Sequence, residues 1–306
     1  MSTADLLAGA MLAGLAVYAV TGGADFGGGV WDLLARGPRA AEQRRLIARA
    51  LAPVWEANHV WLIFVVVVLF SAFPPAFAAL GVEFHAPLTA ALIGIVLRGS
   101  AFVFRSYGGA PAWGRLFAVA SAATPFFLGL VLAGITVRGG AWIGFFPLAV
   151  GALAVALGAY LAAAYLTCET GDPALRADFR RRALASSLAV ALLAALALVA
   201  APEGFAARLH PAIALLTLAL AVAAFVALGR GRYRIARALA AGQGAAMVAG
   251  WGAIQYPTLI APDLTIARAA APDATLRLLV PTIAIGGAIV LPSLYWLMRV
   301  FKSRPD

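Results

Sequence analysis

Residues 53–70 read PVWEANHVWLIFVVVVLF, and this stretch predicts the fold class of the whole chain. Its second half is an unbroken apolar run, which is typical of a helix that crosses a membrane. Its first half carries Glu56, Asn58 and His59, so the same helix would place three polar side chains within the bilayer. Because polar groups are costly in hydrocarbon, those found there usually have a function.

The composition extends this interpretation to all 306 residues. Hydrophobic residues make up 63% of the chain and charged residues 12%, whereas soluble domains are about 25% charged. The chain is therefore predicted to be an all-α integral membrane protein forming a single polytopic domain over residues 1–306. Apolar stretches of about 20 residues predict nine transmembrane helices, at residues 6–34, 50–73, 79–104, 114–137, 142–167, 183–201, 209–228, 235–257 and 277–300.

The net charge of +10 is distributed in a pattern that indicates topology and argues against nucleic acid as a partner. Basic residues gather in alternate connections, beginning with the five arginines between residues 36 and 49. The opposite connections hold only Arg138, Arg208, Arg268 and Arg277. Since basic loops stay in the cytoplasm, the N-terminus is predicted outside and the C-terminus inside. The first helix lacks a basic segment before it and is expected to be retained rather than cleaved.

Topology converts residue number into depth at about 1.5 Å per residue. Asp25 then lies roughly 28 Å below the outer end of its helix, near the cytoplasmic boundary. Glu56 and His59 lie roughly 9 and 13 Å in from the cytoplasmic side, and Arg98 about 10 Å short of the basic loop after its helix. Consecutive helices are usually neighbours. We therefore expect Asp25, Glu56, Asn58, His59 and Arg98 to share one polar cluster in the cytoplasmic half of the membrane.

Three interpretations of this cluster remain open from the residues alone. Arg98 could form a structural ion pair with Glu56 or Asp25 that fixes helix packing. The cluster could bind substrate or ions in a self-contained secondary transporter or a proton-conducting membrane protein. It could also form a proton entry path, because carboxylates and imidazole relay protons while an arginine tunes their charge.

Other candidate sites are weaker. His85 and His210 both fall toward the outer side, but no pairing motif marks them as heme ligands, and we expect hydrogen bonds near the interface instead. The chain is therefore predicted to bind no metal and no cofactor of its own. Gly22, Gly23 and the run at residues 27–29 predict a face that lets another helix approach closely. The single cysteine, Cys168, allows no disulfide within the chain.

Several segments, in order along nearly the whole chain, resemble subunit II of the cytochrome bd-type quinol oxidases. They are the glycine-flanked Asp25 with Trp31 and Asp32, residues 53–63, Phe73-Pro74-Pro75, residues 97–105, residues 165–171, residues 250–257 and residues 261–266. The resemblance implies a fold of two four-helix bundles plus one peripheral helix, which agrees with the nine predicted spans.

The resemblance also implies a division of labour within a respiratory complex of a bacterial or archaeal cell membrane. This chain would be the heme-free subunit, with no catalytic residue of its own. A heme-bearing subunit I, its partner, would carry b-type and d-type hemes, or b-type hemes only, and oxidise quinol. A small single-span accessory subunit, membrane lipid and quinone are further partners that such complexes allow.

In that family, polar residues at the positions of Asp25, Glu56 and Arg98 are implicated in proton delivery from the cytoplasm. Together with Asn58 and His59 they form the predicted proton pathway. One departure stands out: many relatives have an acidic residue within the segment Arg98–Arg105, where this chain has Val103. A route that uses that carboxylate cannot exist here in the same form.

Overall fold

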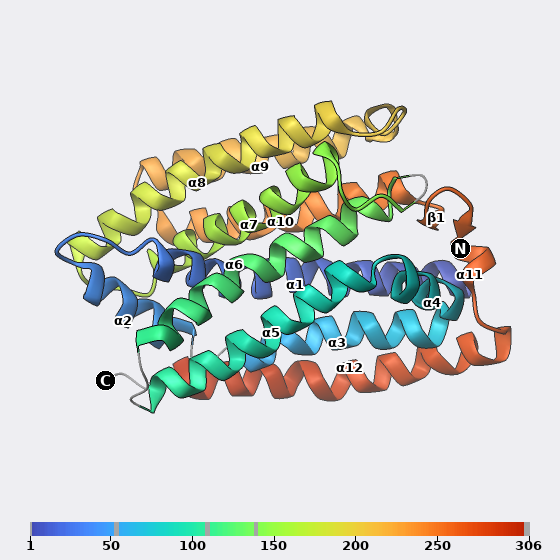
Figure 1. Cartoon of the computed structure of the whole chain (residues 1–306), viewed down its shortest axis with the longest axis horizontal. Coiled ribbons are helices and arrows are strands. Elements are labelled where there is room, and N and C mark those ends of the chain that lie inside the picture. Colours follow the sequence, from blue (N-terminus) through green and yellow to red (C-terminus); the bar gives the residue numbers. More distant parts are fainter. Residues whose placement is uncertain (1, 52–54, 108–110, 138–139, 303–306) are drawn as a thin grey trace.

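The computed structural model describes residues 2–51, 55–107, 111–137 and 140–302. These residues are almost entirely helical, and the long helices run roughly side by side along one axis (Figure 1). The helices are α1 (Thr3–Leu33), α2 (Ala40–Leu51), α3 (Trp55–Ala72), α4 (Pro74–Glu83), α5 (His85–Ser106), α6 (Pro111–Gly134), α7 (Phe145–Leu166), α8 (Pro173–Ala200), α9 (Pro211–Gly229), α10 (Tyr233–Gln255), α11 (Ile266–Ala269) and α12 (Asp273–Lys302). Strands β1 (Thr258–Ile260) and β2 (Leu264–Thr265) pair antiparallel before α11.

Within the described ranges, seven helices are long and apolar enough to cross a membrane: α1, α5, α6, α7, α8, α9 and α12. The pair formed by α3 and α4 meets the same criterion together, although the two helices bend by 115° at their junction. Counting that pair as one broken span gives eight. The chain is therefore a multi-pass membrane protein. The span predicted at 235–257 coincides with α10, which is not among these helices.

Some predicted boundaries differ from the observed ones. The span predicted at 50–73 begins at Trp55, because residues 40–51 form the separate helix α2. The span predicted at 79–104 crosses the junction of α4 and α5 at Phe84. Pro74 and Pro75 start α4, since proline is tolerated in the first turn of a helix and not in its interior.

Helix α2 was not predicted because it contains no long apolar run: its few apolar residues are separated by polar ones. Gln43, Leu46, Ile47 and Ala50 recur at helical spacing and are buried. Arginines occupy much of the opposite side of α2. This amphipathic helix closes one end of the bundle instead of crossing it (Figure 1).

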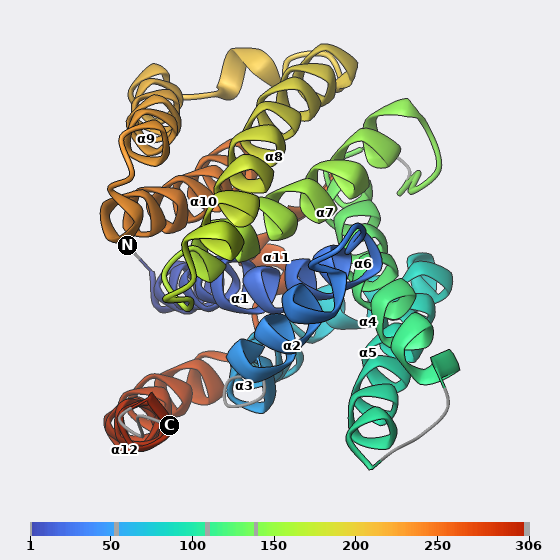
Figure 2. The ribbon, with the colours of Figure 1, turned by 90° about the vertical axis from the view of Figure 1, so that its left-hand side faces the viewer.

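Helix α1 lies in the middle of the bundle and packs against α3, α6, α7 and α10, while α9 and α12 lie at the edges (Figure 2). Glycine explains the closeness of α1 and α7. A Cβ atom at Gly27 would overlap the backbone carbonyl of Gly158, and Trp31 Nε1 donates a hydrogen bond of 2.7 Å to the Ala159 carbonyl. The predicted small-residue face on α1 is confirmed at Gly27.

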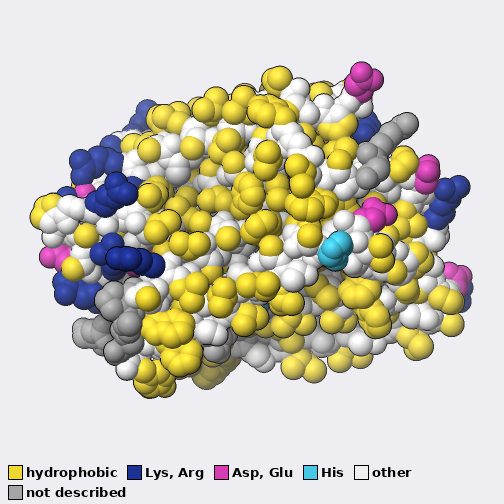
Figure 3. Space-filling model, in the orientation of Figure 1, with side chains coloured by type: hydrophobic (Ala, Val, Ile, Leu, Met, Phe, Trp, Pro, Cys, Tyr) yellow, Lys and Arg dark blue, Asp and Glu magenta, His cyan; other side chains and the backbone are white. Residues whose placement is uncertain are grey.

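Basic side chains gather at one end of the molecule, where α2 and the turn between α7 and α8 lie (Figure 3). Asp178 anchors this end through two bonds from Arg39, at 2.7 and 2.8 Å, and one from Gln43 at 3.0 Å. The bidentate contact with Asp178 raises the pKa of Arg39 above its ordinary value. These bonds join the start of α2 to α8 and add to the apolar contacts that Leu46 and Ile47 make in the core.

Candidate functional site

The centre of the candidate site is an ion pair between α1 and α5. Arg98 Nη2 lies 2.6 Å from Asp25 Oδ1, and the two side chains are only 3% and 1% exposed. The second carboxylate oxygen, Asp25 Oδ2, is buried without a hydrogen-bond partner. The sequence left Arg98 with either Glu56 or Asp25 as its partner, and the structure identifies Asp25.

The guanidinium of Arg98 is fixed on every side. Its Nε donates a hydrogen bond of 2.9 Å to Ser121 Oγ, which in turn donates to the carbonyl of Phe117 at 2.7 Å. The rings of Phe26 and Phe117 lie 5.0 Å from its central carbon. Such contacts stabilise a buried cation without neutralising it. Arg98 is therefore held in one position opposite Asp25.

His59 lies beside this pair on α3. Its ring is 6.0 Å from the ring of Phe26 and 6.1 Å from that of Tyr18, and its Nδ1 is buried without a hydrogen-bond partner. The ring of Phe26 thus lies against both His59 and the guanidinium of Arg98. The structure thus brings Asp25, His59 and Arg98 together, as the sequence predicted.

Asn58 and Glu56 are the other two residues predicted for this cluster. Asn58 is buried on α3, next to His59, with 6% of its surface exposed. The Glu56 side chain lies outside the described part of the chain, so the prediction that it joins the cluster stays a prediction.

A second ion pair repeats the first one, nearer the basic end. Arg105 Nη1 lies 3.0 Å from Asp32 Oδ2, and the side chain of Asp32 is 4% exposed. Asp32 follows Asp25 by seven residues on α1, and Arg105 follows Arg98 by seven on α5. Seven residues are two helical turns, or about 10.5 Å. We call the two pairs the inner rung (Asp25–Arg98) and the outer rung (Asp32–Arg105).

Phe117 of α6 contributes to both rungs. Its ring centre is 5.0 Å from the guanidinium carbon of Arg98 and 5.3 Å from that of Arg105. The ring therefore separates two positive charges and gives each of them a favourable face. One aromatic side chain sets the position of both arginines.

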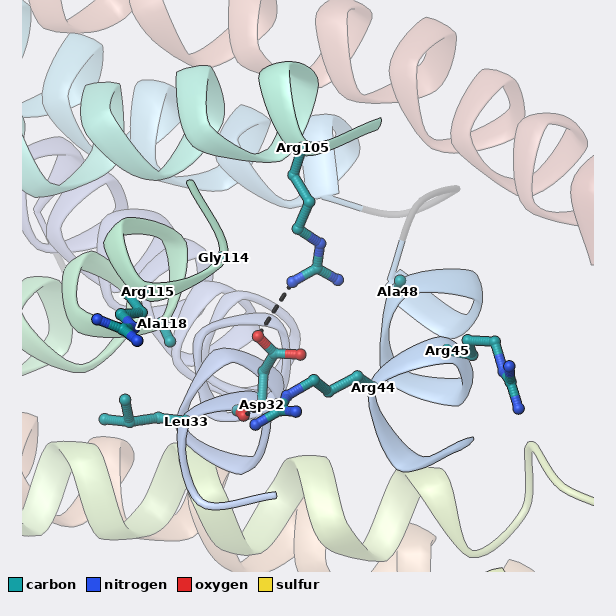
Figure 4. A pocket seen from close by; sticks show the side chains of 9 residues that line it. All are labelled: Asp32, Leu33, Arg44, Arg45, Ala48, Arg105, Gly114, Arg115 and Ala118. Carbon is teal, nitrogen blue, oxygen red and sulfur yellow. Dashed lines mark hydrogen bonds and ion pairs between the residues drawn. The ribbon is translucent and has the colours of Figure 1, made fainter. Parts of the chain in front are cut away.

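A cavity of about 770 Å³ opens over the outer rung. Figure 4 shows Asp32 at its centre, with Arg105 reaching down from α5 and Arg44 reaching in from α2. Arg44 donates a hydrogen bond of 3.0 Å to the carbonyl of Ala35, at the end of α1. The cavity lies at the basic end of the bundle, so the inner rung is deeper in the protein than the outer one.

Asp32, Arg105 and Ser121 were not predicted from the sequence as site residues. The signal for the first two was the equal spacing of seven residues in both α1 and α5, which places acid opposite base twice. Val103, whose apolar side chain the sequence marked as a departure, is 42% exposed on α5. Here the carboxylate next to Arg105 comes from α1 instead.

The two outer histidines make local contacts. His85 Nδ1 lies 3.0 Å from the carbonyl of Val82, and His210 Nδ1 accepts a hydrogen bond of 3.3 Å from the backbone of Ala212 at the start of α9. Among the described residues, no three His, Cys, Asp or Glu side chains are grouped so that they could hold a metal ion.

Comparison with known proteins gives matches in both sequence and structure. The cytochrome bd ubiquinol oxidase subunit 2 of Bacillus subtilis is 30% identical over 93 residues, which is 29% of this chain and 28% of that protein. The cytochrome bd-I ubiquinol oxidase subunit 2 of Escherichia coli K12 is 35% identical over 101 residues, 33% of this chain and 25% of that protein. The matched part of the chain thus covers less than a third of either relative's length.

A chain in the structure of bd oxidase from Geobacillus thermodenitrificans has the same fold, with a TM-score of 0.74 at 12% identity over 99% of both chains. The family model for cytochrome bd terminal oxidase subunit II matches residues 3–301. This match covers nearly the whole chain, in agreement with the segments found in the sequence. The chain belongs to the cytochrome bd terminal oxidase subunit II family.

Proposed function

We propose that this chain is the heme-free subunit II of a respiratory quinol:oxygen oxidoreductase of the cytochrome bd type, in a bacterial or archaeal cell membrane. Its partner is a heme-bearing subunit I, which oxidises quinol and reduces oxygen to water. The support is membership of the family over residues 3–301. Hemes belong to the partner, since this chain is expected to hold none.

The proposed topology is nine spans in one membrane domain, arranged as two four-helix bundles and a peripheral helix. It adds α10 and the broken pair of α3 and α4 to the seven apolar helices. The basic end of the bundle faces the cytoplasm, in accord with the positive-inside rule. The N-terminus is then outside and the C-terminus inside.

Within this complex we assign the chain a second task, delivery of protons from the cytoplasm to the site of oxygen reduction. The observation that carries this proposal is the inner rung, in which a fully buried carboxylate keeps one oxygen without a partner. Intramembrane ionisable groups are costly and mark proton routes in many membrane proteins. Asp25 would receive the proton, Arg98 would hold its charge, and Glu56, Asn58 and His59 would carry the proton onward.

Absorption spectra test the heme-free assignment. The chain is expressed with and without a co-expressed subunit I, purified in detergent, and its heme content is measured per mole of protein. We expect heme only in the two-subunit preparation. Stoichiometric heme in the chain purified alone would contradict the assignment.

Substitution of Glu56 by Gln tests the proton route, because the amide keeps shape and hydrogen bonding but has no titratable proton. The matched control is Glu83→Gln, the same change on the exposed end of α4. We expect E56Q complexes with full heme content to lose oxygen-reduction rate, whereas E83Q complexes keep it. Normal turnover and proton uptake in E56Q would show that the cluster is structural.

A further inference from the structure

The outer rung has the features of a site that exchanges protons with solvent. Asp32 is 4% exposed, yet it lines a cavity of about 770 Å³, large enough for many water molecules. Oδ2 accepts the bond from Arg105, while Oδ1 is buried without a hydrogen-bond partner. A carboxylate beside the cavity, with one oxygen free of hydrogen bonds, can take up a proton that arrives through the cavity.

The cavity does not have the form of an anion site, although four arginines line it. Figure 4 shows the guanidinium groups of Arg45 and Arg115 on opposite sides, directed away from each other. Arg44 is occupied by backbone carbonyls and Arg105 by Asp32. The group at the centre of the cavity is the acid.

Asp32 also stands in register with the inner rung. Both acids lie on α1, both are paired with arginines of α5, and each keeps one buried oxygen free. The axial separation of two turns, about 10.5 Å, is too long for a direct hydrogen bond and requires water molecules between the rungs. The two rungs thus extend from the cavity to the buried carboxylate of Asp25.

We propose that Asp32 is the proton-accepting entrance of this chain, which loads Asp25 through water between the two rungs. A hydronium ion in the cavity gives a proton to the carboxylate of Asp32 and becomes water, and the ion pair with Arg105 weakens as the carboxylate loses its charge. The proton then passes to Asp25 Oδ2, and Asp32 returns to the carboxylate paired with Arg105. This inference rests on the proposed function and adds to it the residue at which protons enter.

Proton uptake in a single turnover tests the inference. The two-subunit complex is reduced and exposed to oxygen, and uptake is followed with a pH-indicator dye in detergent. The variants are Asp32→Asn, which removes the proton site, and Asp32→Glu, which restores it. Glu42→Gln is the matched control, because it removes an exposed carboxylate at the same end of the molecule that takes no part in either rung.

We expect D32N to slow proton uptake at least tenfold at full heme content, D32E to recover it, and E42Q to keep the wild-type rate. Formic acid, a small proton donor that fits the cavity, should speed uptake in D32N and leave E56Q slow. If Asp32 had a purely structural role, a weak acid would not restore proton uptake in D32N.

The outcomes separate the two proposals. Wild-type uptake in D32N together with slow uptake in E56Q would overturn the entrance at Asp32 and leave the proton route standing. Wild-type uptake in both would overturn both proposals. If D32N does not assemble, the double variant Asp32→Asn with Arg105→Gln removes both charges of the rung, and a wild-type rate in that variant would equally overturn the inference.

Discussion

Replacement of Arg98 by Leu is the most demanding test of the inner rung. The change removes the 2.6 Å contact with Asp25, the bond to Ser121 and the cation between two aromatic rings. Leucine fills much of the same volume, so loss of packing is a minor part of the effect. The main consequence is a carboxylate, 1% exposed, without its counter-charge.

Two independent arguments give the same magnitude. Removal of one partner from a buried ion pair typically costs about 3–5 kcal/mol, because the other charge stays buried. Protonation of Asp25 would remove the unpaired buried charge from the variant. Holding an aspartic acid protonated at pH 7 costs about 4 kcal/mol relative to the unfolded chain, where it ionises near pH 3.9. We therefore expect a loss of about 4 kcal/mol at pH 7, smaller by about 1.4 kcal/mol for each unit that the pH is lowered.

A double-mutant cycle isolates the pair. The complexes carrying R98L, Asp25→Asn, and both changes are unfolded in detergent with guanidinium chloride or heat, followed by tryptophan fluorescence. Each single variant leaves an unmatched polar or charged group, whereas the double variant leaves none that is charged. We expect the double variant to be more stable than R98L by about 2–3 kcal/mol. Strictly additive losses in the cycle would refute the argument that the two side chains depend on each other.

Three further predictions follow from the packing of α1 and of the basic end. Gly27→Ala should cost about 3 kcal/mol or more, because its Cβ meets the backbone of α7, while Gly9→Ala on the same helix, with no atom within 4 Å of its Cβ, should be neutral in the same melting assay. Trp31→Phe should lower stability by about 1–2 kcal/mol by removing the bond to Ala159, and a melting temperature equal to wild type would contradict this. Asp178→Asn should expose α2 to limited proteolysis without changing the visible spectrum of the complex, and unchanged cleavage would show that α2 is held by its apolar face alone.

The sequence predicted the long helices well because a membrane requires long apolar runs, and these are visible without a structure. It predicted α2 poorly because that helix lies across the end of the bundle, where short amphipathic spacing replaces an apolar run. It also missed the bend between α3 and α4. Pro74 and Pro75 marked the position of the break, but the angle of 115° depends on what the two helices pack against.

The sequence likewise predicted only part of the candidate site. Asp25, His59 and Arg98 were identified because ionisable residues are costly within apolar runs. Their similar predicted depth in the membrane indicated that they would lie close together. Depth could not choose the partner of Arg98, since Asp25 and Glu56 were both at a suitable level. Asp32 was overlooked because it stands near the end of its span, where a charged side chain would normally reach water. Its burial arises from α2 and α5, and packing of that kind is not visible in one helix's sequence.

The central position of α1 limits how the path could open and close during turnover. Side chains or backbone of α3, α7 and α10 meet it so closely that Gly14, Gly27 and Gly252 admit no Cβ without a shift of their neighbours. Sliding or rotation of α1 would break all three contacts together, and such register shifts take microseconds to milliseconds. The side chain of Arg105, 23% exposed beside the cavity, can instead turn about its own bonds. A change of access to the path would then come from the rotation of a side chain, so a valve in this subunit would have the size of one guanidinium group.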